Sequence, residues 1–566
     1  MYELEYQKWL NFKGLDSEFL NELKTMDESE KEDAFYKNLE FGTGGMRGVI
    51  GAGTNRINTY TIRKANYGFG KFLSQYFMGE LSRGVVIAHD NRNKSVEFAK
   101  ESASVLASFG IKAYLFESLR PTPELSFAVR HLHAIGGIVV TASHNPPKYN
   151  GYKLYDEDGC QLVPRFADEV IKYVNEVEDM FKIDFIEYNE AIKKGLIEII
   201  GKEIDDEYLK QVDTVQLRDD LDKEIKIVFT PLHGTSADIG VRALRNNGYK
   251  VIPVKEQMIP DPFFSTVTSP NPENKEAFEY AIKYGKEHNA DILIATDPDA
   301  DRLGVACLHN GEYILLTGNQ TGAIFVDYIL RTRKEQGILP KKGMVYNTIV
   351  TSELGSVIAK SFGMEVKSTL TGFKFIGEQA KLIEDSDYEF MFGYEESYGY
   401  VIKDFVRDKD SIQALLLISE IANIGKLSGR TLYDYLLFLY KEYGYYYEDL
   451  ANIALEGVDG ENKIKEIMDY FRNNSPKTII GSKVVKVEDF QKSIKYENNT
   501  EEAIDLGKSN VLKFTISDGS WFVLRPSGTE PKLKIYIAVK SESLEEAKQK
   551  NKKIKNEVLA IIEKIL

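Results

Sequence analysis

Short apolar runs that end in polar turns alternate with amphipathic stretches along much of this chain. In the first part of the chain the alternation runs through residues 84–90, 95–110, 113–116, 124–133 and 135–140. Apolar runs of this length are typical of buried strands, and the amphipathic stretches between them are typical of crossover helices in a largely parallel sheet. The order of strand, polar loop and helix recurs near residues 227 and 345. The pattern therefore predicts three related mixed α/β domains.

The two ends of the chain follow other patterns. Residues 1–40 place charged and apolar positions at helical spacing, which predicts helices packed on the first domain. Residues 413–448 are rich in Leu, Ile and Tyr at the same spacing and predict core helices. From Ala451 onward, the pattern predicts a smaller α+β domain with a helix, several strands and a charged terminal helix from about Ser543. We expect domains at residues 1–205, 206–316, 317–448 and 449–566.

The composition narrows the class of protein. The chain has 566 residues, 43% of them hydrophobic and 28% charged, which fits a globular protein of several domains. Its net charge of −15 argues against a nucleic-acid-binding surface, which needs a basic face. Cys160 and Cys307 give no disulfide framework, as expected in a reducing cytosol. No apolar run approaches the roughly 20 residues of a membrane helix, and no signal peptide is visible. We expect a cytoplasmic protein without membrane partners, and the oligomeric state stays open.

The segment that we call the serine loop, residues 141–146, reads Thr-Ala-Ser-His-Asn-Pro. It follows the apolar run 135–140, and a buried strand that closes on Asn-Pro brings a turn to the edge of a sheet. The hydroxyl of Ser143 beside the imidazole of His144 is compatible with an activated nucleophile or a phosphate carrier. It is also compatible with a turn whose Ser and Asn side chains bind the local backbone. The segment alone leaves both interpretations open.

Two loops near the serine loop have side chains or backbone suited to an anion. Residues 41–48 contain four glycines, which let the backbone approach a ligand and expose its N–H groups. Arg47 stands where a dinucleotide-binding loop would have its third glycine, so that site is excluded, whereas a flexible hairpin is not. Residues 151–159 predict a hairpin that carries Lys153, and a charged helix is expected from about Arg165 to Lys182.

The segment that we call the aspartate loop, residues 297–302, reads Asp-Pro-Asp-Ala-Asp-Arg. Alternate residues of an extended loop point the same way, so three carboxylates converge on one hard cation. An EF-hand begins similarly, but it needs Gly and Glu where this chain has Arg302 and Leu308. A solvated acidic turn is disfavoured because a buried strand, residues 291–296, enters the loop. The sequence therefore predicts a metal site on Asp297, Asp299 and Asp301.

The serine loop is similar to the phosphoserine loop of the α-D-phosphohexomutases, the phosphoglucomutase and phosphomannomutase family. The other loops of that family occur in the right order along nearly the whole chain. The resemblance implies that Ser143 carries a phosphoryl group and that Arg47 and Lys153 lie near it, with His144 or Lys153 as the general base. It also implies Mg²⁺ on the three aspartates and on a phosphate oxygen of the phosphoserine.

The resemblance further implies where a phosphosugar binds. Residues 392–399, which we call the glutamate loop, resemble the family's sugar-binding loop, with Glu395 and Ser397 on ring hydroxyls. The other substrate contacts implied are Arg302, Thr371, Gly372 and Lys409. Residues 525–532 offer a guanidinium, hydroxyls and a glycine backbone to an anion and resemble the family's phosphate-binding loop. Its implied ligands are Arg525, Ser527, Gly528 and Thr529. The implied fold has four domains around one central cleft.

The implied activity is that of a phosphoglucomutase, which interconverts glucose 1-phosphate and glucose 6-phosphate through a glucose 1,6-bisphosphate intermediate. Two departures bear on the sugar: Tyr394 stands between Gly393 and Glu395, and the aspartate loop lacks the family's Asp-Gly-Asp form. Both resemble the branch that holds many bacterial phosphoglucomutases and the phosphopentomutases. A phosphomannomutase or phosphopentomutase of the same family stays open, as does a non-catalytic phosphosugar-binding regulator.

Overall fold

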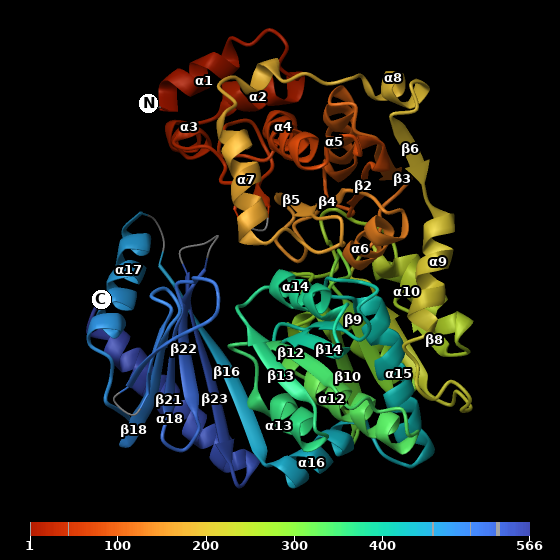
Figure 1. Cartoon of the computed structure of the whole chain (residues 1–566), viewed down its shortest axis with the longest axis vertical. Helices are drawn as coiled ribbons and strands as arrows, with labels where there is room; N and C mark the ends of the chain where they lie inside the picture. Colours follow the sequence, from red (N-terminus) through yellow and green to blue (C-terminus); the bar gives the residue numbers. More distant parts are fainter. Residues whose placement is uncertain (1, 43–44, 456–457, 498–499, 528–531) are drawn as a thin grey trace. The chain divides into compact units, whose positions relative to one another are not determined.

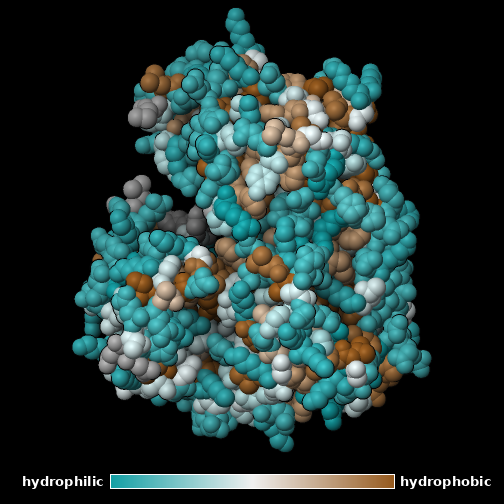
Figure 2. Space-filling view, viewed as in Figure 1, coloured by the Kyte–Doolittle hydropathy of each residue, from teal (hydrophilic) through white to brown (hydrophobic). Residues whose placement is uncertain are grey.

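The computed structural model describes residues 2–42, 45–455, 458–497, 500–527 and 532–566 (Figure 1). The chain divides into two compact units. The first comprises Met1–Thr321, Thr332–Gly343 and Phe373–Tyr433, and the second comprises Gly322–Arg331, Met344–Gly372 and Asp434–Leu566. On the face shown in Figure 2, hydrophilic residues predominate. Among the described residues, no helix has the length and apolar character needed to cross a bilayer.

The first sheet of the first unit has four parallel strands in a row, which reach one edge of the sheet. Its strand order is β1 (Met46–Val49), β5 (Tyr149–Tyr155), β4 (Gly136–Val140), β2 (Val85–His89), β3 (Ala113–Phe116) and β6 (Ile197–Ile200). Strands β4, β2, β3 and β6 are parallel, whereas β5 and β1 are antiparallel. The helices that pack with it are α4 (Thr59–Tyr76), α5 (Ser95–Ser108), α6 (Thr122–His131) and α7 (Pro164–Asn175). Figure 1 shows the strands between α5 and α6, so the predicted alternation of strands and helices is confirmed here.

The second sheet of the first unit follows the same plan. Its strand order is β11 (Glu312–Leu315), β10 (Leu303–His309), β9 (Ile292–Thr296), β7 (Lys226–Thr230) and β8 (Lys250–Pro253). Strands β8, β7 and β9 are parallel, and β10 turns back antiparallel to β9. Helices α10 (Ser236–Asn246) and α11 (Glu279–His288) connect them. The aspartate loop connects β9 to β10. It can be short because adjacent antiparallel strands need no crossover connection.

Helices complete the first unit. As predicted, the N-terminal segment is helical, with α1 (Tyr2–Leu10), α2 (Ser17–Thr25) and α3 (Glu28–Phe35) packed around buried Trp9. The glutamate loop contains the end of β14 (Glu389–Glu395), the start of β15 (Gly399–Val401) and the turn between these two antiparallel strands. Helices α14 (Phe373–Ile383), α9 (Lys202–Asp213) and α15 (Ser411–Leu427) also belong to this unit, and α12 (Gly318–Glu335) contributes residues to both units.

The second unit contains the C-terminal sheet and a parallel strand pair. Strands β12 (Gly343–Thr348) and β13 (Glu365–Thr369) are parallel, and α13 (Glu353–Ser361) connects them. The C-terminal sheet runs in the order β16 (Tyr445–Ala454), β23 (Lys532–Ser541), β22 (Trp521–Pro526), β21 (Leu512–Ile516), β18 (Ser482–Asp489), β19 (Ile494–Glu497) and β20 (Thr500–Ala503). Apolar residues of α17 (Val458–Asn473) and α18 (Leu544–Glu563) share one core with it.

Two predicted helices were too long. The helix expected over 165–182 ends at Asn175. The helical stretch expected over 413–448 is α15 and α16 (Leu432–Tyr443), and from Tyr445 the chain is already strand β16. Residues 445–454 pair with β23 over their whole length, and the three consecutive tyrosines there favour a strand once a partner is present. Strand β16 therefore continues across residue 448, and the domain limits themselves stay predictions.

Candidate active site

Strand β4 brings Ser143 to the edge of the first sheet in a strained turn. Its φ angle is +49°, in the left-handed region that a residue with a Cβ rarely adopts. The backbone N–H of Ser143 donates to Oγ1 of Thr141 at 2.8 Å, which anchors the turn from within. The serine side chain is buried, and its Oγ lies 3.1 Å from Nδ1 of His144. A buried hydroxyl in a strained turn is typical of a functional position.

Strand β9 brings the aspartate loop to the same place. Oγ of Ser143 donates to Oδ2 of Asp297 at 2.5 Å. The other oxygen of Asp297 accepts from the backbone N–H groups of Asp301 and Arg302, which closes the loop. Ala300 has a φ angle of +56°, and its carbonyl accepts from the hydroxyl of Ser411 at the start of α15. The loop is thus held by its own first carboxylate and by a neighbouring helix.

The three aspartates of this loop fit a hard cation. One carboxylate oxygen from each of Asp297, Asp299 and Asp301 lies within 4.8 Å of the other two, and all three residues are buried. Oδ1 of Asp299 and Oδ1 of Asp301 are buried and have no hydrogen-bond donor among the described residues. Burial and the two neighbouring carboxylates raise the pKa of Asp297 well above its ordinary value. Clustered carboxylates with unsatisfied oxygens are what a magnesium site requires.

Two lysines partly balance this negative charge. Nζ of Lys153, on β5, lies 2.9 Å from Oδ2 of Asp299, and Nζ of Lys409 lies 3.1 Å from Oδ2 of Asp301. Burial by itself would lower the pKa of both lysines, but the aspartates outweigh it and raise the pKa of each. Lys153 conversely holds the pKa of Asp299 well below its ordinary value, against the effect of burial. Both lysines are therefore fixed positive charges in this site.

His144 and two arginines surround the serine. Burial lowers the pKa of His144 well below its ordinary value, and the charges of Arg302 and Arg47 add to this effect. Nη1 of Arg47, on β1, donates to the side chain of Asn145 at 2.7 Å. Nη1 of Arg302 pairs with Glu273. Among these groups only the neutral imidazole is ready to accept a proton.

The glutamate loop lies against the aspartate loop. Arg302 and Gly399 form an isolated antiparallel bridge, and the N–H of Leu303 donates to the carbonyl of Tyr398 at 3.0 Å. A Cβ on Gly399 would lie 2.2 Å from Cδ of Lys409, so the missing side chain gives the lysine its path to Asp301. Glu395 is buried and Ser397 is half-buried. Glu395 is the last residue of β14, and Ser397 lies in the turn that leads to β15.

Four profiles of known protein domains match most of the chain. The profiles describe the phosphoglucomutase/phosphomannomutase family. Its alpha/beta/alpha domain I matches residues 38–180, domain II matches 206–311 and domain III matches 317–443, and its C-terminal domain matches residues 478–553. The chain belongs to the phosphoglucomutase/phosphomannomutase family. It is an α/β protein with the four domains of the phosphohexomutase fold, as predicted, and it is an isomerase of the phosphohexomutase class.

Individual relatives agree with the family match. The phosphoglucomutase of Staphylococcus haemolyticus (strain JCSC1435) is 38% identical over 545 residues, which cover 96% of this chain and 97% of that protein. The phosphoglucomutase of Staphylococcus aureus (strain MRSA252) is 39% identical over 528 residues, covering 92% and 93%. The open form of parafusin, a phosphoglucomutase from Paramecium, has a TM-score of 0.66 at 18% identity and covers 94% of this chain and 95% of that chain. The last likeness concerns the fold alone.

The family's sites are not all in this cluster. The first unit contains most of the predicted site residues: Ser143, His144, Lys153, Arg47, the aspartate loop, Glu395, Ser397 and Lys409. Thr371 and Gly372 belong to the second unit, as do Arg525 and Ser527, and their contribution to the site stays a prediction. Nη1 of Arg525 donates to the hydroxyl of Tyr536 at 3.2 Å. Gly528 and Thr529 lie outside the described residues.

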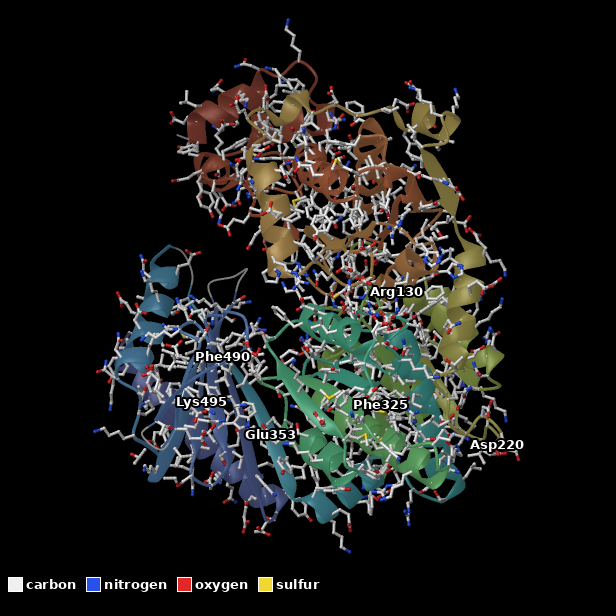
Figure 3. All side chains as sticks on the ribbon, in the orientation of Figure 1. Arg130, Asp220, Phe325, Glu353, Phe490 and Lys495 are labelled. Carbon is white, nitrogen blue, oxygen red and sulfur yellow. The ribbon has the colours of Figure 1, made fainter. Side chains whose placement is uncertain are left out.

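Sequence reasoning missed residues that support the site from behind. The hydroxyl of Thr122, at the start of α6, donates to Oδ2 of Asp299 at 3.1 Å. Arg130, labelled in Figure 3, lies in the last turn of α6 and donates to the carbonyl of Asp404 and to Glu384. Arg92 binds the backbone of the serine loop. The available signal was position, because Arg92 lies in a polar loop that follows strand β2, next to β4 in the sheet.

Proposed function

We propose that this protein interconverts glucose 1-phosphate and glucose 6-phosphate through a phosphorylated Ser143 and a glucose 1,6-bisphosphate intermediate. Phosphoglucomutase activity is supported by the curated relatives of that name, which align with nearly the whole chain. The observation that carries the proposal is the contact between Oγ of Ser143 and the carboxylate of Asp297, because it joins a phosphate carrier to a cation site. The substrate class is a small phosphosugar.

The reaction consists of two phosphoryl transfers. In the first, the bond between phosphorus and Oγ of Ser143 breaks, a bond from phosphorus to the free hydroxyl of the bound monophosphate forms, and a base moves the hydroxyl proton to Oγ of Ser143 as it leaves. The bisphosphate then reorients, and its other phosphoryl group returns to Ser143 while the proton is given back. His144 suits the role of base, because its depressed pKa keeps the imidazole neutral and its Nδ1 lies 3.1 Å from the serine Oγ. Lys153, with its raised pKa, suits charge neutralisation instead.

The aspartate loop is the proposed magnesium site. Asp297, Asp299 and Asp301 would hold the ion, and the two unsatisfied oxygens of Asp299 and Asp301 support this assignment. A bound Mg²⁺ supplies neutralisation of the charge on the transferred phosphoryl group. Fixed positive charge around the transferred phosphoryl group would also come from Lys153, Lys409, Arg47 and Arg302. Neutralisation of charge is the main requirement of phosphoryl transfer.

The remaining roles follow the family's loops and are part of the proposal. Glu395 and Ser397 bind ring hydroxyls, and Thr371 and Gly372 extend this sugar contact. The loop with Arg525, Ser527, Gly528 and Thr529 binds the phosphate that does not react. A guanidinium with neighbouring hydroxyls and backbone N–H groups is a suitable anchor for a phosphate dianion.

The identity of the sugar is tested by kinetics. We expect kcat/KM for glucose 1-phosphate to exceed the values for mannose, glucosamine and ribose 1-phosphates in a coupled assay with Mg²⁺ and glucose 1,6-bisphosphate. A preference for mannose or ribose 1-phosphate would assign the protein to the phosphomannomutases or phosphopentomutases. Binding of phosphosugars without turnover of any of them would instead indicate a regulator.

A further inference from the structure

A fully buried arginine, Arg92, binds the backbone of the serine loop from behind. Its side chain has an exposed fraction of 0%. Nη2 donates to the carbonyl oxygens of Ser143 and Asn145, and Nη1 donates to the carbonyl oxygens of Pro146 and Tyr149 at 2.9 and 3.0 Å. One guanidinium therefore contacts three carbonyl groups of the serine loop and that of Tyr149, the first residue of β5.

The turn needs such a donor because its own backbone offers few. Pro146 and Pro147 have no N–H group, and Ser143 has a left-handed φ of +49°. A left-handed conformation of a residue other than glycine costs about 1–3 kcal/mol and persists only where the surroundings impose it. Buried carbonyl groups without donors would add to this cost. The five N–H groups of a guanidinium form a planar fork that can serve several carbonyls at once.

Arg92 is itself held rigidly. Its Nε lies 3.3 Å from Oδ2 of Asp90, and Oδ1 of Asp90 accepts from the hydroxyl of Ser95 at 2.7 Å and from the backbone N–H of Arg92 at 2.9 Å. Its guanidinium carbon lies 5.0 Å from the ring centroid of Phe264. The contacts of Arg92 go to main-chain oxygens of the loop and not to Oγ of Ser143, which donates to Asp297.

We infer that Arg92 is a positioning residue that holds the hydroxyl of Ser143 in line for phosphoryl transfer, by fixing the carbonyl groups of the serine loop. The inference rests on the proposed function for its kinetic consequence. Misplacing a reacting atom by about 1 Å can reduce the rate by about 100-fold, whereas binding of a substrate held by other loops changes little. A purely stabilising arginine would instead change the melting temperature and leave the turnover of the folded protein unaltered.

The test compares Arg92→Lys with a matched control, Arg472→Lys, in the full-length protein. Arg472 is also largely buried, with Nε 3.0 Å from Asp489 and Nη2 2.9 Å from Asn510, and it lies in the C-terminal domain. The substituted lysine keeps the charge but loses the fork. We expect Arg92→Lys to reduce kcat for glucose 1-phosphate, and the rate at which glucose 1,6-bisphosphate phosphorylates Ser143, by about 100-fold with KM within about threefold. Arg472→Lys should change only the melting temperature.

Hydrogen exchange of the backbone supplies a readout that does not depend on activity. Peptides that cover residues 141–150 should exchange faster in Arg92→Lys than in the wild type, and at the wild-type rate in Arg472→Lys. If Arg92→Lys does not fold, Asp90→Asn, which loosens the arginine but leaves it in place, should give the same changes to a smaller extent.

The outcomes separate the two proposals. Unchanged exchange over 141–150, or faster exchange with full kcat, would overturn the positioning role of Arg92. A wild-type protein that neither phosphorylates Ser143 nor turns over any phosphosugar would refute the proposed function, and the exchange comparison would then decide alone whether Arg92 holds the loop.

Discussion

Oγ of Ser143 lies 2.5 Å from Oδ2 of Asp297, although 154 residues separate the two in the chain. Strand β4 of one sheet and strand β9 of another bring them together. A phosphoryl group on Ser143 would lie beside the aspartate carboxylates that suit a cation. A cation bound there would therefore contact the oxygens of that phosphoryl group.

Replacing Ser143 tests whether it is the phosphate carrier. We expect the intact mass of the wild type to show a phosphorylated fraction that Ser143→Ala lacks, and turnover of glucose 1-phosphate in that variant should fall by several orders of magnitude. Ser74→Ala is a suitable control, because Oγ of Ser74 donates to the carbonyl of Gly70 within helix α4, away from the serine loop in the sequence. Full activity in Ser143→Ala would exclude the phosphoserine mechanism.

Neutralising one aspartate weakens the cation site without altering its shape. Asp299→Asn has nearly the same volume, but it removes the charge next to the unsatisfied Oδ1, so the Mg²⁺ concentration needed for half-maximal turnover should rise by about tenfold or more. Direct binding of Mg²⁺ should weaken in parallel. Asp291→Asn, in the same domain but paired with Lys426, should leave both unchanged. Turnover that persists in excess chelator would argue against a metal enzyme.

A methyl group on Gly399 tests the position of Lys409. The new Cβ would lie 2.2 Å from Cδ of Lys409, so Gly399→Ala should displace the amine from Asp301. Loss of one charge-assisted contact of about 1.5–3 kcal/mol corresponds to roughly 10–100-fold in kcat/KM. Gly507→Ala is the control, because a Cβ there meets its nearest neighbour at an ordinary 3.5 Å. Equal kcat/KM values of Gly399→Ala and Gly507→Ala would show that the position of Lys409 does not matter for the reaction.

Asp410 should make stability depend on pH. This carboxyl caps helix α15, and burial raises its pKa to about 6. The folded state therefore binds its proton more tightly than the unfolded state, whose carboxyl has a pKa of about 3.9, and stability falls as pH rises through the window between the two values. The shift of about two units corresponds to about 3 kcal/mol.

Asp410→Asn should flatten this part of the pH profile while the amide still caps the helix. Urea midpoints measured between about pH 4 and pH 7 would show the difference. The exposed Asp238 gives the control Asp238→Asn, with the slope of the wild type. A variant at position 410 that keeps the wild-type slope would mean that another group titrates.

Arg525 tests the anchor of the phosphate that does not react. Arg525→Ala should reduce kcat/KM for glucose 1-phosphate by roughly 10–100-fold, since a charge-assisted contact contributes about 1.5–3 kcal/mol. Phosphorylation of Ser143 by glucose 1,6-bisphosphate should continue, although more slowly. Lys495→Ala, on the same sheet and labelled in Figure 3, removes a positive charge paired with Glu502 and should have no effect. An unchanged kcat/KM in Arg525→Ala would mean that the anchor lies elsewhere.

Local patterns predicted the elements that carry the chemistry. The apolar runs before Ser143 and Asp297 are strands β4 and β9, because a short run of β-branched and apolar residues has few other ways to be buried. The alternating aspartates form the buried carboxylate cluster that their spacing predicted. Helical periodicity was less reliable at its ends. Residues 445–448 suit a helix by spacing, yet they join a strand because β23 lies beside them.

The loops that hold reactive groups, and their order, could be predicted from the sequence, because turns, strand ends and charge spacing are local properties of the chain. Which of these groups meet depends on the folded structure. Three contacts join positions that are distant in the chain. Arg92 donates to carbonyl groups of the serine loop, the hydroxyl of Thr122 donates to Asp299, and the side chain of Lys409 packs against Gly399. Such contacts depend on how sheets and helices pack. They cannot be predicted from local patterns, because the residues that pack together are far apart in the sequence.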